Sequence, residues 1–145
     1  MKSNENHSTL VQYRASIAIK ILRDNVESIP NVQVWADMVG VSRRWLSSTM
    51  KSAYGKSPKE ILREIKFEKV VSLISEEGMK AGCFSVALDA GFKSAAGLSK
   101  FLTAFYALNF TTLKTEVISD VGQLTFNWLE DVPKKETYFS KWKQF

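Results

Sequence analysis

The sequence predicts an all-α fold with two helix-turn-helix subdomains joined by a long central helix. The architecture expected is homeodomain-like, with an additional C-terminal tail whose structure the sequence leaves open. Three observations support this fold. Proline is scarce, with 3 in 145 residues. Apolar residues recur at three- and four-residue steps, which is the period of an amphipathic helix. A pattern of short helix, glycine and longer helix occurs twice, which indicates a duplicated helix-turn-helix.

The chain starts with a polar stretch, residues 1–8, that we expect to be disordered. A helix is predicted over residues 9–29, because Pro30 ends it. Its apolar stripe is expected to consist of Leu10, Tyr13, Ile17, Ile21 and Leu22.

The first motif follows directly. A short helix over 34–39 is broken by Gly40, which can take the positive φ of a tight turn. Ser42 is the expected N-cap of a second helix over 43–54. Gly55 stands where a C-cap glycine would.

A long helix is predicted over 58–77, with Ser57 as its cap and a proline in its first turn. After it, the first motif repeats: the Ala36 to Gly40 spacing is matched by Ala87 to Gly91. The second turn holds one extra residue. The expected organisation is therefore a disordered start, a first subdomain, a linker helix, a second subdomain and a C-terminal extension, over residues 1–8, 9–57, 58–77, 78–118 and 119–145.

These motifs resemble the AraC/XylS family of bacterial transcription regulators, most closely its short members that consist of little more than the double-motif DNA-binding domain. The resemblance covers about residues 10–116. It implies promoter binding on double-stranded DNA, contact with RNA polymerase, frequent action as an activator, and a cytoplasmic location on the bacterial nucleoid. The matching runs are Trp35-Ala36, Gly40-Val41-Ser42, Leu46-Ser47, Gly55-Lys56-Ser57-Pro58, Leu62-Arg63, Leu73-Ile74, Val86-Ala87, Gly91-Phe92-Lys93-Ser94 and Leu98-Ser99-Lys100.

The second motif departs from the family pattern. Where the family usually has a glycine, a Ser/Thr-Pro pair and Tyr-Arg, this chain has Ala107, Asn109-Phe110 and Leu113-Lys114. An aromatic residue of the family is replaced by Leu98.

The first recognition helix carries one polar stripe. Arg44, Ser47, Ser48 and Lys51 stand at i, i+3, i+4 and i+7, and therefore share one face. Such a stripe can be ordinary solvated surface, but inside a doubled motif it favours DNA readout. We expect base contacts from Arg44, Ser47 and Ser48, because arginine pairs bidentately with guanine. Phosphate or groove-edge contacts are expected from Arg43 and Lys51, and Lys56 is a further expected DNA contact.

The second recognition helix, about 94–104, is chemically different. Two small residues, Ala95 and Ala96, offer only methyl contacts, and Gly97 weakens the helix. We expect this half to position the protein through phosphate contacts, with little base selectivity. Its expected contact residues are Lys93, Ser94, Ala95, Ala96, Ser99 and Lys100.

Composition agrees with nucleic-acid binding. The net charge is +5, and the excess lies mid-chain: residues 31–118 hold 12 Lys/Arg against 8 acids. The 20-residue central helix would span about 30 Å, close to one duplex turn of about 34 Å. A single chain could then address two adjacent grooves. Dimerisation is the alternative.

Other chemistry finds little support in the sequence. The only histidine, His7, lies in the polar start, and no His/Cys/acid cluster suits a metal. We expect no enzyme activity and no cofactor. The single cysteine, Cys83, is expected to be a core thiol in a reducing compartment. No apolar run approaches the roughly 20 residues of a membrane span.

The aromatic tail, residues 119–145, leaves two interpretations open. It is either a strap that packs on the domain or a surface for a protein partner or a homodimer. Together with the departures in the second motif, it keeps an alternative function open, that of a protein-binding adaptor or antagonist that retains the fold.

Overall fold

The computed structural model describes the backbone of residues 2–119 and the side chains from residue 9 onward. All regular structure in this range is helical, which confirms the all-α prediction. The expectations for the tail beyond Ser119 lie outside the described residues. The elements are α1 (Lys2–Asp24), η1 (Val26–Ser28), α2 (Val32–Val39), α3 (Arg43–Tyr54), α4 (Pro58–Glu77), η2 (Gly78–Lys80), α5 (Cys83–Asp89), α6 (Ala95–Tyr106) and α7 (Phe110–Ser119).

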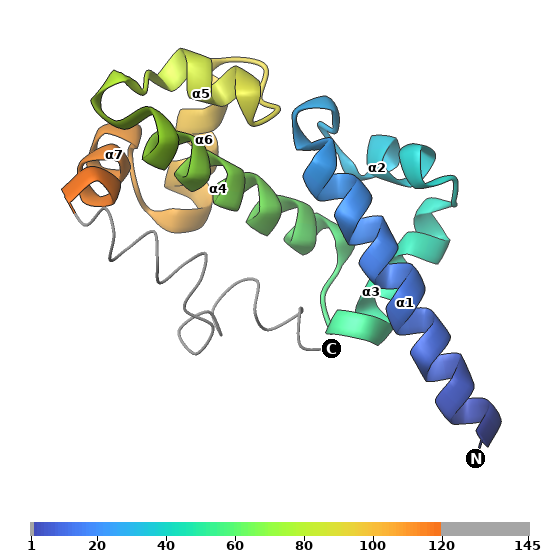
Figure 1. The fold of residues 1–145 in the computed structure, drawn as a ribbon. Coiled ribbons are helices and arrows are strands. Elements are labelled where there is room, and N and C mark those ends of the chain that lie inside the picture. Colours follow the sequence, from blue (N-terminus) through green and yellow to red (C-terminus); the bar gives the residue numbers. More distant parts are fainter. Residues whose placement is uncertain (1, 120–145) are drawn as a thin grey trace. The chain divides into compact units, whose positions relative to one another are not determined.

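The chain divides into two compact units, and the division falls inside α4, between Ile65 and Lys66. Figure 1 shows α4 as one continuous helix that follows α3 and precedes α5. Each half of α4 belongs to one unit, so this helix is a part of two cores rather than a separate linker. The two units are described in turn.

In the first unit, α1, α2 and α3 pack on one another (Figure 1). Trp35 of α2 is fully buried. Its indole Nε1 donates a hydrogen bond of 2.9 Å to the carbonyl oxygen of Ala18 in α1. The indole therefore gains a partner for its N–H while its ring fills the core. The buried apolar residues are Ala15, Ala18, Ile19, Leu22, Val26, Ile29, Trp35, Ala36, Leu46, Met50, Ala53, Ile61, Leu62 and Ile65.

Three expectations for α1 are wrong. The helix ends at Asp24, before the predicted end at residue 29, and the short helix η1 follows it. The α1 backbone is already helical from Lys2, where a disordered start is predicted, because residues 2–8 contain no glycine or proline to stop the helix. Three members of the predicted core stripe, Leu10, Tyr13 and Ile17, are instead 44%, 62% and 41% exposed. The buried face is led by the small residues Ala15 and Ala18, which allow α1 to approach its neighbours closely.

The second unit is built from the second half of α4 and from η2, α5, α6 and α7. Contacts join α5 to α6, α6 to α7, and η2 to α7. The ring of Phe67 in α4 stacks on Tyr106 at the end of α6, with centroids 3.9 Å apart. The buried apolar residues of the second unit are Phe67, Val70, Val71, Leu73, Ile74, Ala81, Val86, Ala87, Ala90, Leu98, Leu102, Phe110, Leu113 and Val117.

The two turns repeat one another in their hydrogen bonds. After α2, Gly40 has φ +89°, and the amide of Val41 donates to the carbonyl of Ala36 at 3.0 Å. After α5, Gly91 has φ +92°, and the amide of Phe92 donates to the carbonyl of Ala87 at 2.8 Å. The duplicated pattern in the sequence thus corresponds to a duplicated backbone geometry.

The departures at the end of the second motif each have a local role. Ala107 takes φ +55°, the left-handed conformation that favours glycine. The Asn109 side chain accepts a 2.7 Å hydrogen bond from the amide of Thr112 and so caps α7. The Lys114 ammonium donates to the carbonyl of Ala81 at 2.7 Å. These positions keep the turn and the packing of α7 despite their changed residues.

Candidate nucleic-acid interface

The polar stripe of α3 is solvent-exposed. Its four members, Arg44, Ser47, Ser48 and Lys51, all lie on the surface, and so does Arg43 beside them. The opposite face, formed by Leu46, Thr49, Met50 and Ala53, is buried. Burial of that face fixes the rotation of α3, so the stripe points away from the core of the first unit.

The N-terminus of α3 is held independently of the arginines. The Ser42 hydroxyl accepts a 3.0 Å hydrogen bond from the amide of Trp45. Arg43 and Arg44 therefore follow a capped helix start, where the helix dipole disfavours cations. Neither arginine contributes to the cap. Their charges are available to an anionic ligand, which would offset this unfavourable position.

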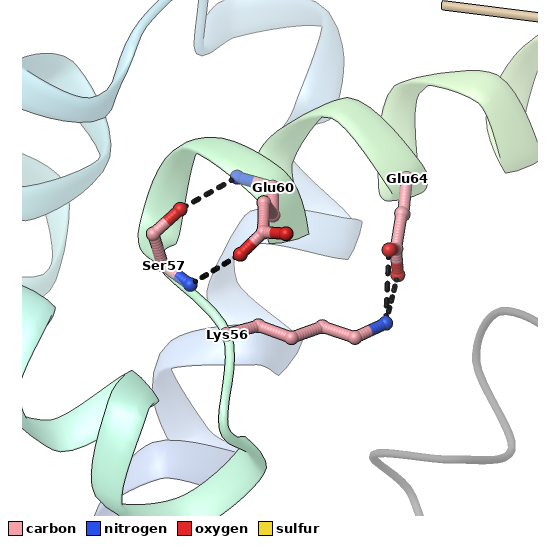
Figure 2. Close-up of polar contacts among 4 residues, drawn as sticks. All are labelled: Lys56, Ser57, Glu60 and Glu64. Atoms are coloured by element: carbon pink, nitrogen blue, oxygen red, sulfur yellow. Dashed lines mark hydrogen bonds and ion pairs between the residues drawn. The ribbon is translucent and has the colours of Figure 1, made fainter.

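Lys56 lies apart from the α3 stripe, although the sequence analysis includes it among the DNA contacts. Figure 2 shows its ammonium directed at Glu64 of α4, with Nζ 2.9 Å from both carboxylate oxygens. The two side chains are only 18% and 13% exposed. Because its charge is neutralised within the first unit, Lys56 is a poor candidate for a phosphate contact.

Next to this pair, α4 begins with a capping box, of which the sequence prediction included only the Ser57 cap. The amide of Ser57 donates to Glu60 Oε1 at 2.9 Å, and the amide of Glu60 donates to Ser57 Oγ at 3.2 Å (Figure 2). The Ser57 amide is the main reason why the pKa of Glu60 is lowered. The spacing Ser-x-x-Glu was a usable signal in the sequence.

In the second unit, α6 presents a weaker face. Ala96, Ser99 and Lys100 are exposed, as is Lys93 in the turn, whereas Ala95 is half-buried. Ser94 is the N-cap of α6. Its hydroxyl accepts a 3.0 Å hydrogen bond from the amide of Gly97, so its oxygen already serves the helix. This face thus exposes the ammonium groups of Lys93 and Lys100, the hydroxyl of Ser99 and small side chains.

The part of the chain that the structure describes contains no cluster of side chains suited to a metal ion. No group of three or more His, Cys, Asp or Glu side chains could hold a metal ion among these residues. Cys83 opens α5, is half-buried, and packs against the core of the second unit. Over the described helices, none is both long and apolar enough to cross a membrane.

Comparison with known proteins decides the family. A family model described as a helix-turn-helix domain matches residues 35–116, more than half of the chain. The chain belongs to the AraC-type helix-turn-helix family. The match covers both turns, α3 and α6. It confirms the resemblance inferred from the paired motifs.

A solved AraC-type structure supports the fold. It is the crystal structure of a transcriptional regulator from Chromobacterium violaceum, described as an AraC-type DNA-binding domain-containing protein. The two chains are 21% identical, with a TM-score of 0.61 over 72% of this chain and 92% of the other. No curated protein matches the sequence. The family membership supports a DNA-binding transcription regulator.

Proposed function

We propose that this protein is a sequence-specific regulator that binds double-stranded DNA by placing α3 and α6 in major grooves. The exposed α3 stripe carries the proposal. One arginine, one lysine and two hydroxyls project from one face of a helix whose other face is buried, and a second arginine, Arg43, lies beside that face. This is the arrangement with which a recognition helix reaches base edges.

The two recognition helices have different tasks in this proposal. Arg44, Ser47 and Ser48 contact bases, while Arg43 and Lys51 contact phosphates or the groove edge. On α6 and its turn, Lys93 and Lys100 contact phosphates, and Ser99, Ala95 and Ala96 face the groove. Phosphate contacts orient a protein without reading sequence. Base selectivity therefore comes mainly from the first motif. Ser94 stays outside the contacts, because it caps α6.

The family membership extends the proposal to promoters. Action as an activator through RNA polymerase, at the bacterial nucleoid in the cytoplasm, fits the resemblance. The 20 residues of α4 correspond to about 30 Å, which suits one chain that addresses two adjacent grooves. Dimerisation through residues 119–145 is the alternative arrangement.

A protein-binding adaptor or antagonist is the second candidate. The observation that favours it is the set of exposed apolar side chains on α1, Leu10, Tyr13 and Ile17. Exposed apolar side chains that share a helix face are suited to a partner. The roles of Ala107 and Asn109 weaken the other argument for this candidate, because the second motif keeps its turn and helix cap.

A fluorescence anisotropy titration separates the two candidates. The full chain is added to a labelled random duplex at two salt concentrations. For a DNA regulator, affinity falls steeply with salt, because each neutralised phosphate releases counterions. The absence of salt-dependent binding to any duplex would reject the regulator proposal.

A further inference from the structure

The first helix of the second motif, α5, is short and weakly capped. It comprises 7 residues, and its N-cap, Gly82, makes no side-chain cap hydrogen bond. Its C-cap is Ala90, which has no side-chain polar group to offer. By contrast, the matching helix of the first motif is capped by the side chain of Asn31. Short helices depend on tertiary contacts for their stability, so the ends of α5 need support from elsewhere.

One end is held by Lys66 of α4. The side chain is buried, with only 6% of the residue exposed. Its Nζ donates a hydrogen bond of 3.1 Å to the carbonyl oxygen of Gly91. The same Nζ lies 4.8 Å from the ring centroid of Phe92, within cation–π range. Gly91 and Phe92 form the turn that leads from α5 into α6, so a single ammonium contacts both turn residues.

The other end is held by Lys114 of α7. Its Nζ donates a 2.7 Å hydrogen bond to the carbonyl oxygen of Ala81. Ala81 is buried and lies two residues before α5 begins. Hydrogen bonds from a charged donor are stronger than neutral ones. The two lysines therefore bracket α5, one at each end.

Burial of a lysine side chain costs free energy, because its ammonium group loses contact with water. Burial disfavours the ammonium and lowers the pKa of Lys66 to about 8. A well-packed apolar side chain of similar volume would avoid this cost. The contacts of the ammonium with the Gly91 carbonyl and the Phe92 ring give this charge a structural use.

We propose that Lys66 and Lys114 are positioning residues that fix the second motif for DNA, and that neither contacts DNA itself. They hold the two ends of α5, and the turn held by Lys66 sets the start of α6. The effect on DNA rests on the proposed function. The effect on the turn does not depend on that function, because Lys66 contacts Gly91 and Phe92 in the protein without DNA.

Amide hydrogen exchange on the full chain, free in solution at pH 7, tests the local effect. The variants are K66M, K114M, K66R and K114R, with K80M as the control because Lys80 is an exposed lysine of the same unit. Loss of a charged hydrogen bond corresponds to a change of about tenfold or more. We expect K66M to raise exchange by that factor at the amides of Gly91 and Phe92. K114M should do so at the amides of Ala81 and Val86, which donate to the carbonyls of Gly78 and Gly82. Both arginine variants and K80M keep the protection of the wild type.

Three results would overturn the proposal. One is wild-type protection at both ends of α5 in the methionine variants. Another is an equal loss of protection across α5, α6 and α7, which would make the lysines general stabilisers. A third is that arginine restores no protection at either position.

The same variants, titrated with a labelled random duplex, extend the test to DNA. K66M is expected to bind about tenfold more weakly, with K66R near the wild type. Unchanged affinity in K66M would overturn the link from turn to DNA. If the wild type itself binds no duplex, the proposed function fails, while the exchange measurement still decides the role of the lysines.

Discussion

Individual residues explain why the second motif keeps its fold with an unusual sequence. Glycines 40 and 91 were predictable, since a tight turn after a short helix needs positive φ. Ala107 was not, because alanine strongly disfavours the left-handed region in which the structure places it. The sequence of the second motif therefore departs from the family pattern at Ala107, whereas the structure shows that α6 ends there in a strained but intact C-cap.

Replacing Ala107 by glycine should stabilise the second unit. The left-handed backbone destabilises alanine by about 1–2 kcal/mol. Glycine removes this strain, but it loses more conformational entropy on folding, which offsets part of the stabilisation. The net increase in the free energy of unfolding should be about 0.5–1 kcal/mol, measured by urea denaturation. The matched control is A104G, inside α6, which should lower stability by a similar amount. A loss of stability in A107G would contradict the strain at this residue.

The titration of Lys66 should make stability depend on pH. The unfolded chain keeps this proton up to about pH 10.5, and the folded chain releases it near 8. Between these values the unfolded state binds more protons, so a rise in pH favours folding. From pH 8 to 10.5, the free energy of unfolding of the wild type should rise relative to K66M by about 1–3 kcal/mol. Parallel pH profiles from urea denaturation would show that Lys66 keeps its ordinary pKa.

At the scale of elements, helices with clear end signals were predictable. The structure places α3 and α4 at the predicted residues, because Ser42, Gly55 and Pro58 mark their ends. The rotation of α1 was not predictable from its large apolar residues. Two alanines bury more completely than Leu10 or Tyr13, because close approach of helices rewards small side chains. Which face is buried depends on partners that a single helix does not reveal.

The connection from α3 to α4 yields a prediction about Lys56. The K56M substitution removes the 2.9 Å ion pair with the half-buried Glu64, and should lower the free energy of unfolding by about 1–2 kcal/mol. Duplex affinity and its salt dependence should stay those of the wild type. The comparison is K51A, on the exposed stripe, which should keep stability and weaken DNA binding. Urea denaturation and anisotropy titrations at several salt concentrations measure both quantities. A lower salt slope in K56M would return Lys56 to the interface.

At the scale of the whole molecule, the doubled motif made the fold and the family predictable. Two copies in the same order specify two turns and two recognition helices, and the two turns share one pattern of backbone hydrogen bonds. The division of the chain inside α4 could not be predicted from the sequence. A continuous apolar face does not show which of the two cores each turn of the helix joins. The stripe on α3 is exposed as predicted, whereas its contacts with DNA remain a prediction.

Base readout by the first motif can be tested by a selection of bound sequences from a random duplex library. The wild type, R44A and K100A are compared at one salt concentration. The wild type should enrich a defined motif. R44A should lose preference at one or more base positions, since a bidentate arginine contributes about 1–3 kcal/mol of discrimination. K100A should enrich the same motif with lower affinity for all sequences. An unchanged motif in R44A, or a greater loss of base preference in K100A than in R44A, would contradict the assignment of base readout to the first motif.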